Sequence, residues 1–424
     1  MGGEKKKGGS AAAGRRAASA GREHDEPRLR HAAIGIESEF IFILNEEEVN
    51  PKDIFADPRG FIRGDLMHRV GSSYHIPTGG AVYFDNGVIE VATPLIEIER
   101  GCAVRAGRSL WESILFVRDE LDDWERRTGN ATRLKAFSTH YNVSFDLPGA
   151  GPSGGRTVEK CALLLSYILP APVMLLAANK RSTGIGVRPR GDRLEVTADF
   201  TPSSSLMIAT ATLVTGIIRE VLSWDSFELS QLDEKGIPRI KGFKPMPHTS
   251  RKGWLARFSC YPRNPFTEDP DAAVWETIGG PVAAAVSTPR LSSLREIARA
   301  VLGRFKRPIA RISDPFTLRL IHTVIGGGTP SLLQLPDRPE SYDNVGRLCR
   351  WEKIFPERLL SRSQYERILI RAISGKRLCL GGESYTPVGM KGWARVVFRR
   401  DADATTHTRD IDFLLDHLND WERS

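Results

Sequence analysis

The sequence predicts an α+β protein, in which several mostly antiparallel strands pack with helices and a smaller, mainly helical C-terminal region follows. Segments with alternating apolar and polar residues recur through the first half of the chain, and longer segments with helical spacing separate them. A Pro- and Lys-rich stretch over residues 237–253 then indicates a boundary. We therefore expect a tail, a main domain and a C-terminal region at residues 1–31, 32–245 and 246–424.

The first expected strand is IGIESEFIFIL, residues 34–44. It places Glu37 and Glu39 on one face and Ile36 with two phenylalanines on the other. Residues 51–79 are expected to be loop-rich with one short helical piece. Alternation predicts further strands at 81–94, 135–146 and 193–200, and a strand pair near 392–401.

Helical spacing is clearest over residues 102–127, which end before Gly129, a residue typical of helix ends. Residues 161–178 are almost wholly apolar but contain Pro170 and Pro172. We therefore expect one buried helix or two short ones there, and no membrane span. Further helices are predicted at 204–224, 291–305, 363–374 and 409–422.

The composition excludes several classes of protein. Hydrophobic residues make up 41% of the chain and charged residues 26%, as in an ordinary globular protein. The five cysteines are scattered without CxxC spacing, which argues against a disulfide framework or a zinc site and favours a cytoplasmic location. We find no signal peptide and expect no membrane partner.

The formal net charge of +8 arises partly in residues 1–31, a Gly-, Ala-, Ser- and Lys-rich segment that we expect to be disordered. The rest of the chain has no basic stripe interleaved with aromatic residues. Nucleic acid is therefore not an expected partner.

Three of the expected strands carry polar side chains in an apolar framework. Oxygen-rich groups of this kind suit a hard divalent cation such as Mg²⁺, which commonly bridges to the phosphates of a nucleotide. Arginines on a fourth strand region suit phosphate oxygens, because the guanidinium fork matches their geometry. The groups are Glu37 and Glu39, then Tyr83, Asp85 and Glu90, then His140 and Asn142, and finally Arg188, Arg190 and Arg193.

Asp85 and Glu90 are five residues apart, which would place them on opposite faces of one continuous strand. Asn86-Gly87 between them is a strong turn signal, so we expect a loop with Asp85 at its rim. Simpler interpretations stay open: the two glutamates of the first strand on a solvated edge, His140 as a hydrogen-bonded core histidine, and the arginines as a solvated loop.

Five segments stand out in this order: GIESEF (35–40), GGAVYFDNGVIEVATP (79–94), STHYNVSF (138–145), RLEVTADFTPSSSLMIATATLVTGIIREVL (193–222) and GWARVVFRRDADATTHTRDIDFLLDHL (392–418). Together they resemble the motifs of the Pup ligase and depupylase family, part of the carboxylate–amine ligase superfamily. The resemblance begins at Ile34 and runs through nearly the whole chain, with little similarity over residues 240–380.

This resemblance implies the glutamine synthetase-like catalytic fold for residues 32–245, with the strand pair near 392–401 completing a nucleotide site. It also implies ATP and Mg²⁺ as cofactors. Glu39 remains a candidate ligand from its position near Glu37. By position, the resemblance implies metal ligation by Glu37, Tyr83 and Glu90, a catalytic base at Asp85, nucleotide contacts from Thr93 and Trp393, and site-lining roles for His140, Asn142, Arg190 and Arg193.

The chain departs from the family pattern at several of these positions. Ala81 stands where the family has an arginine two residues before the metal-binding tyrosine, which removes one nucleotide contact. Tyr141 stands where the family has a carboxylate. The segment from Asp85 to Glu90 is one residue shorter than in the family.

The reaction implied is the ATP-dependent formation of an isopeptide bond through an acyl phosphate. A glutamate carboxylate of a small protein modifier ending in Glu or Gln would be joined to a lysine of an acceptor protein. A depupylase-like deamidase or isopeptidase, a small-molecule amidoligase and a catalytically dead binding protein stay open as alternatives. Residues 41–82 hold no obvious insertion like the extra loop of the depupylases, which favours ligation.

Overall fold

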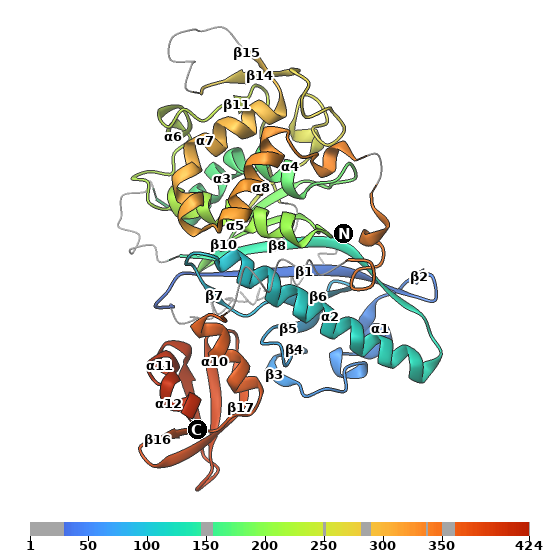
Figure 1. The fold of residues 1–424 in the computed structure, drawn as a ribbon, viewed down its shortest axis with the longest axis vertical. Helices are drawn as coiled ribbons and strands as arrows, with labels where there is room; N and C mark the ends of the chain where they lie inside the picture. Colours follow the sequence, from blue (N-terminus) through green and yellow to red (C-terminus); the bar gives the residue numbers. More distant parts are fainter. Residues whose placement is uncertain are drawn as a thin grey trace, which may run out of the picture.

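The computed structural model shows a large antiparallel sheet with helices on one face and a separate C-terminal lobe (Figure 1). Strand β1 lies inside the sheet, between β6 and β8. The structure describes residues 29–145, 156–248, 252–280, 290–335, 338–349 and 361–423.

The large sheet has twelve strands in the order β12-β13-β9-β10-β8-β1-β6-β5-β4-β3, with β2 and β7 also paired to β1. All of its pairs are antiparallel, as predicted, so no crossover helix has to cover its second face. The strands are β1 (Ala33–Leu44), β2 (Glu47–Glu48), β3 (Met67–Val70), β4 (Ser73–His75), β5 (Ala81–Asp85), β6 (Val88–Ala92), β7 (Ile96–Glu97), β8 (Thr132–Ser144), β9 (Ile185–Pro189), β10 (Arg193–Asp199), β12 (Met246–Pro247) and β13 (Trp254–Ala256).

The two faces of the sheet differ because side chains alternate along each strand. On β1, Ile36 and Phe40 are fully buried in the core, while Glu37 and Glu39 lie on the opposite face. The apolar face therefore holds the core, and the other face carries polar groups.

Helices cover the apolar face. Helix α2 (Cys102–Thr128) packs on β1 and β6, and α5 (Ser204–Val221) packs on β8. Helices α3 (Val158–Ile168) and α4 (Pro170–Ala177) form a buried pair bent by 61°, which confirms the interpretation of this apolar segment as two short helices. The remaining helices of this part are α1 (Pro51–Phe55), α6 (Ser230–Glu234), α7 (Leu294–Ile312) and α8 (Pro315–Gly326).

Helix α5 is long and apolar enough to cross a membrane, and so is the α3–α4 pair if it is counted as one span. In the fold, 83% of the apolar window of α5 is buried, against α2, α7 and α8 among other elements. Core packing accounts for its composition.

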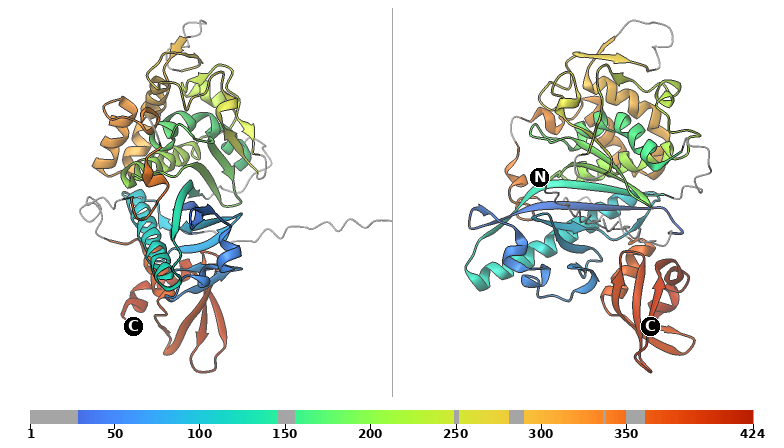
Figure 2. Two further views of the ribbon diagram at one scale, coloured as in Figure 1. Left: turned by 90° about the vertical axis from the view of Figure 1, so that its right-hand side faces the viewer. Right: turned by 180° about the vertical axis from the view of Figure 1, so that it is seen from behind.

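The C-terminal lobe lies at one end of the molecule (Figure 2). A second hydrophobic core forms there around Tyr365, Phe398 and Trp421, and Met67 of β3 also belongs to it. Its sheet order is β16-β17-β18-β19, and helices pack on this sheet, so the lobe is a mixture of strands and helices. Its elements are α10 (Gln364–Ile373), β16 (Leu378–Leu380), β17 (Glu383–Lys391), β18 (Arg395–Arg400), β19 (Thr406–Asp410), α11 (Ile411–Asp416) and α12 (Leu418–Arg423).

The core of the main body continues as far as Cys349, well past the boundary expected at residue 245. Strands β12 and β13 still extend the large sheet, and α7 and α8 pack on α5. The Pro- and Lys-rich stretch at 237–253 is thus a connection within the main body, where a small sheet also forms. That sheet consists of β11 (Arg239–Ile240), β14 (Trp275–Ile278) and β15 (Arg290–Ser292).

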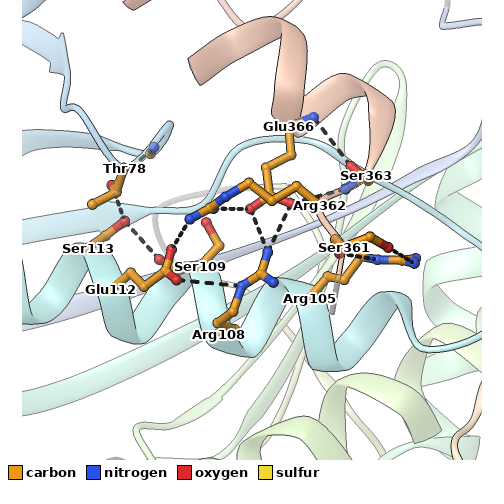
Figure 3. A network of polar contacts seen from close by, with 11 residues as sticks. Thr78, Arg105, Arg108, Ser109, Glu112, Ser113, Ser361, Arg362, Ser363 and Glu366 are labelled. Atoms are coloured by element: carbon orange, nitrogen blue, oxygen red, sulfur yellow. Dashed lines mark hydrogen bonds and ion pairs between the residues drawn. The ribbon is translucent and has the colours of Figure 1, made fainter. Parts of the chain in front are cut away.

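An ion-pair network, which we call the clasp, joins α10 of the lobe to α2 of the main body (Figure 3). The carboxylate of Glu366 is fully buried and accepts hydrogen bonds from Arg108, at 2.9 Å, and from Arg362, at 2.5 Å. Arg362 also donates to Glu112 of α2 at 3.0 Å. Because a buried carboxylate is costly without compensating charge, the clasp fixes the lobe against α2.

Arg108→Met should lower the free energy of unfolding by about 3 kcal/mol, because it leaves the buried Glu366 carboxylate with one arginine fewer. Urea unfolding followed by tryptophan fluorescence measures this change. Arg126→Met removes an exposed ion pair with Asp123 on the same helix and should change the free energy by less than about 0.5 kcal/mol. Equal effects of the two substitutions would show that the clasp does not hold the lobe.

Candidate active site

The predicted site residues on four adjacent strands share the polar face of the sheet. In the register of the strands, Tyr83 pairs with Glu90, Glu90 with Glu39, and Glu37 with His140. Neighbouring strands lie about 4.8 Å apart, so these side chains converge. The residues brought together in this way are Glu37, Glu39, Tyr83, Asp85, Glu90, His140 and Asn142.

The turn between β5 and β6 places Asp85 on the same face as Glu90. Asn86 and Gly87 have positive φ angles of 45° and 88°, as a tight two-residue hairpin requires, and Asp85 pairs with Val88 across it. The predicted turn is confirmed. Without it, the five-residue offset would have separated the two carboxylates.

Glu37, Glu90 and His140 could together hold a metal ion, because one potential ligand atom of each lies within 4.8 Å of the others. Nδ1 of His140 is 3.6 Å from Oε2 of Glu37 and 3.9 Å from Oε1 of Glu90. Two carboxylates and an imidazole form a donor set that fits a divalent cation. Glu39 is not part of this triad. Its carboxylate lies 3.6 Å from Nε2, the other ring nitrogen of His140.

The electrostatics of the triad also fit a cation. Burial, together with the negative charges of Glu37 and Glu39, raises the pKa of Glu90 to about 8. Burial disfavours the charge on Glu37 as well, but the hydrogen bond and the charge of His140 outweigh it and lower the pKa of Glu37 to about 2. The two carboxylates therefore cannot both be charged at low cost unless a positive charge lies between them.

Tyr83 lies beside the triad and interacts with it through Glu90. Burial, with the charges of Glu37 and Glu90, raises the pKa of Tyr83 well above its usual value. The phenol therefore keeps its proton and donates a hydrogen bond to Glu90. Ligation of a metal by Tyr83 stays a prediction.

A pocket between the sheet and the lobe, which we call the lobe pocket, lies on one side of the triad. Its wall combines apolar residues with groups that can donate hydrogen bonds, and Trp393 of the lobe closes it. Arg193 is held in place by Nε donation to Asn142 at 3.0 Å, and the Thr93 hydroxyl accepts the backbone N–H of Ile36 at 3.0 Å. The lining residues include Leu29, Gly35, Glu37, Thr93, Leu95, Asn142, Arg193 and Trp393.

A second pocket, the sheet pocket, lies on the other side of the triad, along β8, β9 and β10. It has acidic groups at the β5–β6 end and cationic groups toward β13. Within it, the buried Arg188 pairs with Glu195. The lining residues include Glu39, Asp85, Phe137, Ser138, His140, Arg188, Thr197, Asp199, His248 and Arg257.

Arg190 is a predicted site residue that belongs neither to the triad nor to the lining of either pocket. Its guanidinium forms a two-pronged ion pair with Glu195, with Nε and Nη2 at 3.0 Å and 2.9 Å. The sequence showed the three arginines as a group but not that Glu195 would pair with two of them.

Two polar residues near the triad were missed from the sequence. Ser138 donates to Glu39 and contacts Nε2 of His140 at 3.1 Å. Ser138 is two residues before His140, so both side chains lie on the same face of β8, and the alternation along this strand could have indicated Ser138. Arg69 comes from β3, a four-residue strand in a region expected to be loop-rich, and nothing in its local pattern indicates its position.

No protein-family model and no curated protein matches the chain. Among solved structures, the complex between the prokaryotic ubiquitin-like protein Pup and its ligase PafA aligns with it. That alignment covers 92% of this chain and 93% of that chain, with a TM-score of 0.47 and 11% sequence identity. This similarity is too low to support a functional argument, which therefore depends on the side chains of this protein.

The metal-free protein should lose stability as the pH rises from about 5 to 9. The folded-state pKa of Glu90 is raised to about 8, so its contribution is fully present below its unfolded pKa and is lost as the pH rises through 8. Thermal unfolding in EDTA at pH 6 and pH 9 measures this loss. Glu90→Gln should show a smaller fall, and Mg²⁺ should restore the wild-type protein at pH 9. If the wild-type protein and Glu90→Gln lost the same stability between pH 6 and pH 9, Glu90 would not be the cause of the loss.

Proposed function

We propose that the protein is an ATP- and Mg²⁺-dependent carboxylate–amine ligase. In this proposal it joins a glutamate carboxylate of a small protein modifier to a lysine amine as an isopeptide bond. One observation carries the proposal: a triad of the half-buried Glu37 with the buried Glu90 and His140 lies between two pockets on the open face of an antiparallel sheet. A nucleotide on one side and a carboxylate substrate on the other would meet at the triad.

The lobe pocket suits the nucleotide. Trp393 and Leu95 offer apolar surface for a base, while the guanidinium of Arg193, which also donates to Asn142 and Asp192, would place a cation beside the phosphates. Glu37 lines this pocket and belongs to the triad, so a cation held there would be in contact with the phosphate chain. When bound, Mg²⁺ would neutralise the phosphates and favour transfer of the terminal phosphoryl group.

The sheet pocket suits the carboxylate and amine substrates. Asp85 and His140 line it together, so a substrate in this pocket would reach the triad from the side opposite the nucleotide. Arg257 lies at its far end, where Arg188 and Arg190 share the single carboxylate of Glu195; the arginines outnumber that carboxylate, which favours an acidic substrate.

The proposed reaction has two steps. The substrate carboxylate first attacks the γ-phosphorus of ATP, which forms an acyl phosphate and releases ADP. The amine then attacks the acyl carbon, forms the amide and releases inorganic phosphate. Asp85 would accept the proton that the amine must lose, because it lies at the rim of the sheet pocket, where an incoming lysine enters.

Asp85→Asn should reduce product formation at least about 100-fold, because the amide cannot accept the proton of the amine. Nucleotide affinity should stay within about twofold, since Asp85 lines the sheet pocket and not the lobe pocket. ADP release is measured with ATP, Mg²⁺, a peptide ending in glutamate and a lysine-containing peptide, and nucleotide affinity is measured by calorimetry.

Asp53→Asn, at an exposed position of α1, serves as the control and should leave both quantities unchanged. Normal turnover of Asp85→Asn would refute its role as base. A wild-type protein that neither binds nucleotide nor releases ADP would refute the ligase proposal, and cleavage of an isopeptide without ADP release would favour the hydrolytic alternative.

A further inference from the structure

Arg69 lies between the lobe and the polar face of the sheet, in contact with two aromatic residues of the candidate site. Its guanidinium carbon is 4.7 Å from the ring centroid of Trp393 and 5.7 Å from that of Tyr83. Trp393 closes the lobe pocket, and Tyr83 donates a hydrogen bond to Glu90. Arg69 does not itself line either pocket; it adjoins the lobe pocket through Trp393 and the proposed metal site through Tyr83.

The strand order brings β3 and β4 beside β5, next to the triad. Met67 pairs with His75, and His75 pairs with Ala81, which alternates with Tyr83 on β5. The register shifts between His68 and Val70, so Arg69 lies at an irregularity of β3. Its contacts with Tyr83 and Trp393 show which way its side chain points.

Within the described part of the chain no carboxylate forms an ion pair with Arg69, although the charge of Arg69 helps to lower the pKa of Glu37. Its Nη1 donates to the Ser73 hydroxyl at 3.1 Å, while its Nε is buried and makes no hydrogen bond there. By contrast, Arg188 and Arg190 pair with Glu195. A buried donor on a charged group is costly without a partner, so this geometry suits an anionic ligand.

His75 does not compete for such a ligand. Its ring meets that of Trp393 edge to face, with the ring centroids 4.8 Å apart. Burial, reinforced by the charge of Arg69, lowers the pKa of His75 to about 3. At neutral pH the imidazole is uncharged. Among the four side chains in contact here, Arg69, Tyr83, His75 and Trp393, Arg69 therefore carries the positive charge.

Ala81 of β5, which pairs with His75, is fully buried and offers no charge to a ligand. We propose that Arg69 binds the phosphate chain of the nucleotide from β3. This inference rests on the proposed function, because it requires a nucleotide in the lobe pocket.

Arg69→Met tests the proposal, because methionine keeps an apolar contact with the two rings and removes the charge. Calorimetry with ADP and with adenosine, both at fixed Mg²⁺, measures affinity. ADP binding should weaken about tenfold or more, while adenosine binding should change less than twofold. Arg69→Lys keeps the charge without the planar fork and should show an intermediate loss.

Arg59→Met is the matched control. Arg59 also lies over a tyrosine, 5.1 Å from the centroid of Tyr74, but it is exposed and paired with Asp57. This substitution should leave ADP affinity unchanged. Thermal unfolding without nucleotide shows whether Arg69→Met alters the fold.

The outcomes separate the two proposals. If Arg69→Met lost ADP and adenosine affinity equally, Arg69 would support Trp393 without binding phosphate. If its ADP affinity were unchanged, the inference would also be overturned. In both cases the proposed function would stand. Failure of the wild-type protein to bind either compound would refute the nucleotide site itself.

Discussion

Two carboxylates on neighbouring strands, the half-buried Glu37 of β1 and the buried Glu90 of β6, set the constraint on which the site depends. Two like charges about 4 Å apart near a protein surface repel by about 4 kcal/mol. The structure balances this cost with His140 and with a proton on Glu90, and a divalent cation would balance it fully. The open face, the tight β5–β6 turn and the two flanking pockets all surround this point.

The lobe is attached to the main body on two sides of this site. The clasp holds α10 against α2 through the buried Glu366, and Trp393 reaches across to Arg69 and His75. Because Trp393 closes the lobe pocket, both attachments determine the shape of the proposed nucleotide site. Stability of the lobe and binding in the pocket should therefore be coupled.

Much of this arrangement could be predicted from local sequence, and the limits have physical causes. The alternation in β1 and β8 and the Asn86-Gly87 turn indicate which polar groups share a face, because both signals lie within a few residues. Strands β3 and β4, of four and three residues, are too short to show a period, so Arg69 could not be placed. The pairing of Arg190 with Glu195 and the separate lobe core depend on tertiary contacts that no local pattern shows.

The central claim is that the triad holds a divalent cation next to a nucleotide. Crystals grown with Mn²⁺ in place of Mg²⁺ and with ADP test it directly, because manganese gives an anomalous signal. The account predicts an anomalous peak at coordination distance from Glu37 and Glu90, about 2.0 to 2.6 Å, with ADP in the lobe pocket against Trp393. ADP bound there without a cation at the triad, or a cation there with ADP bound elsewhere, would contradict the account.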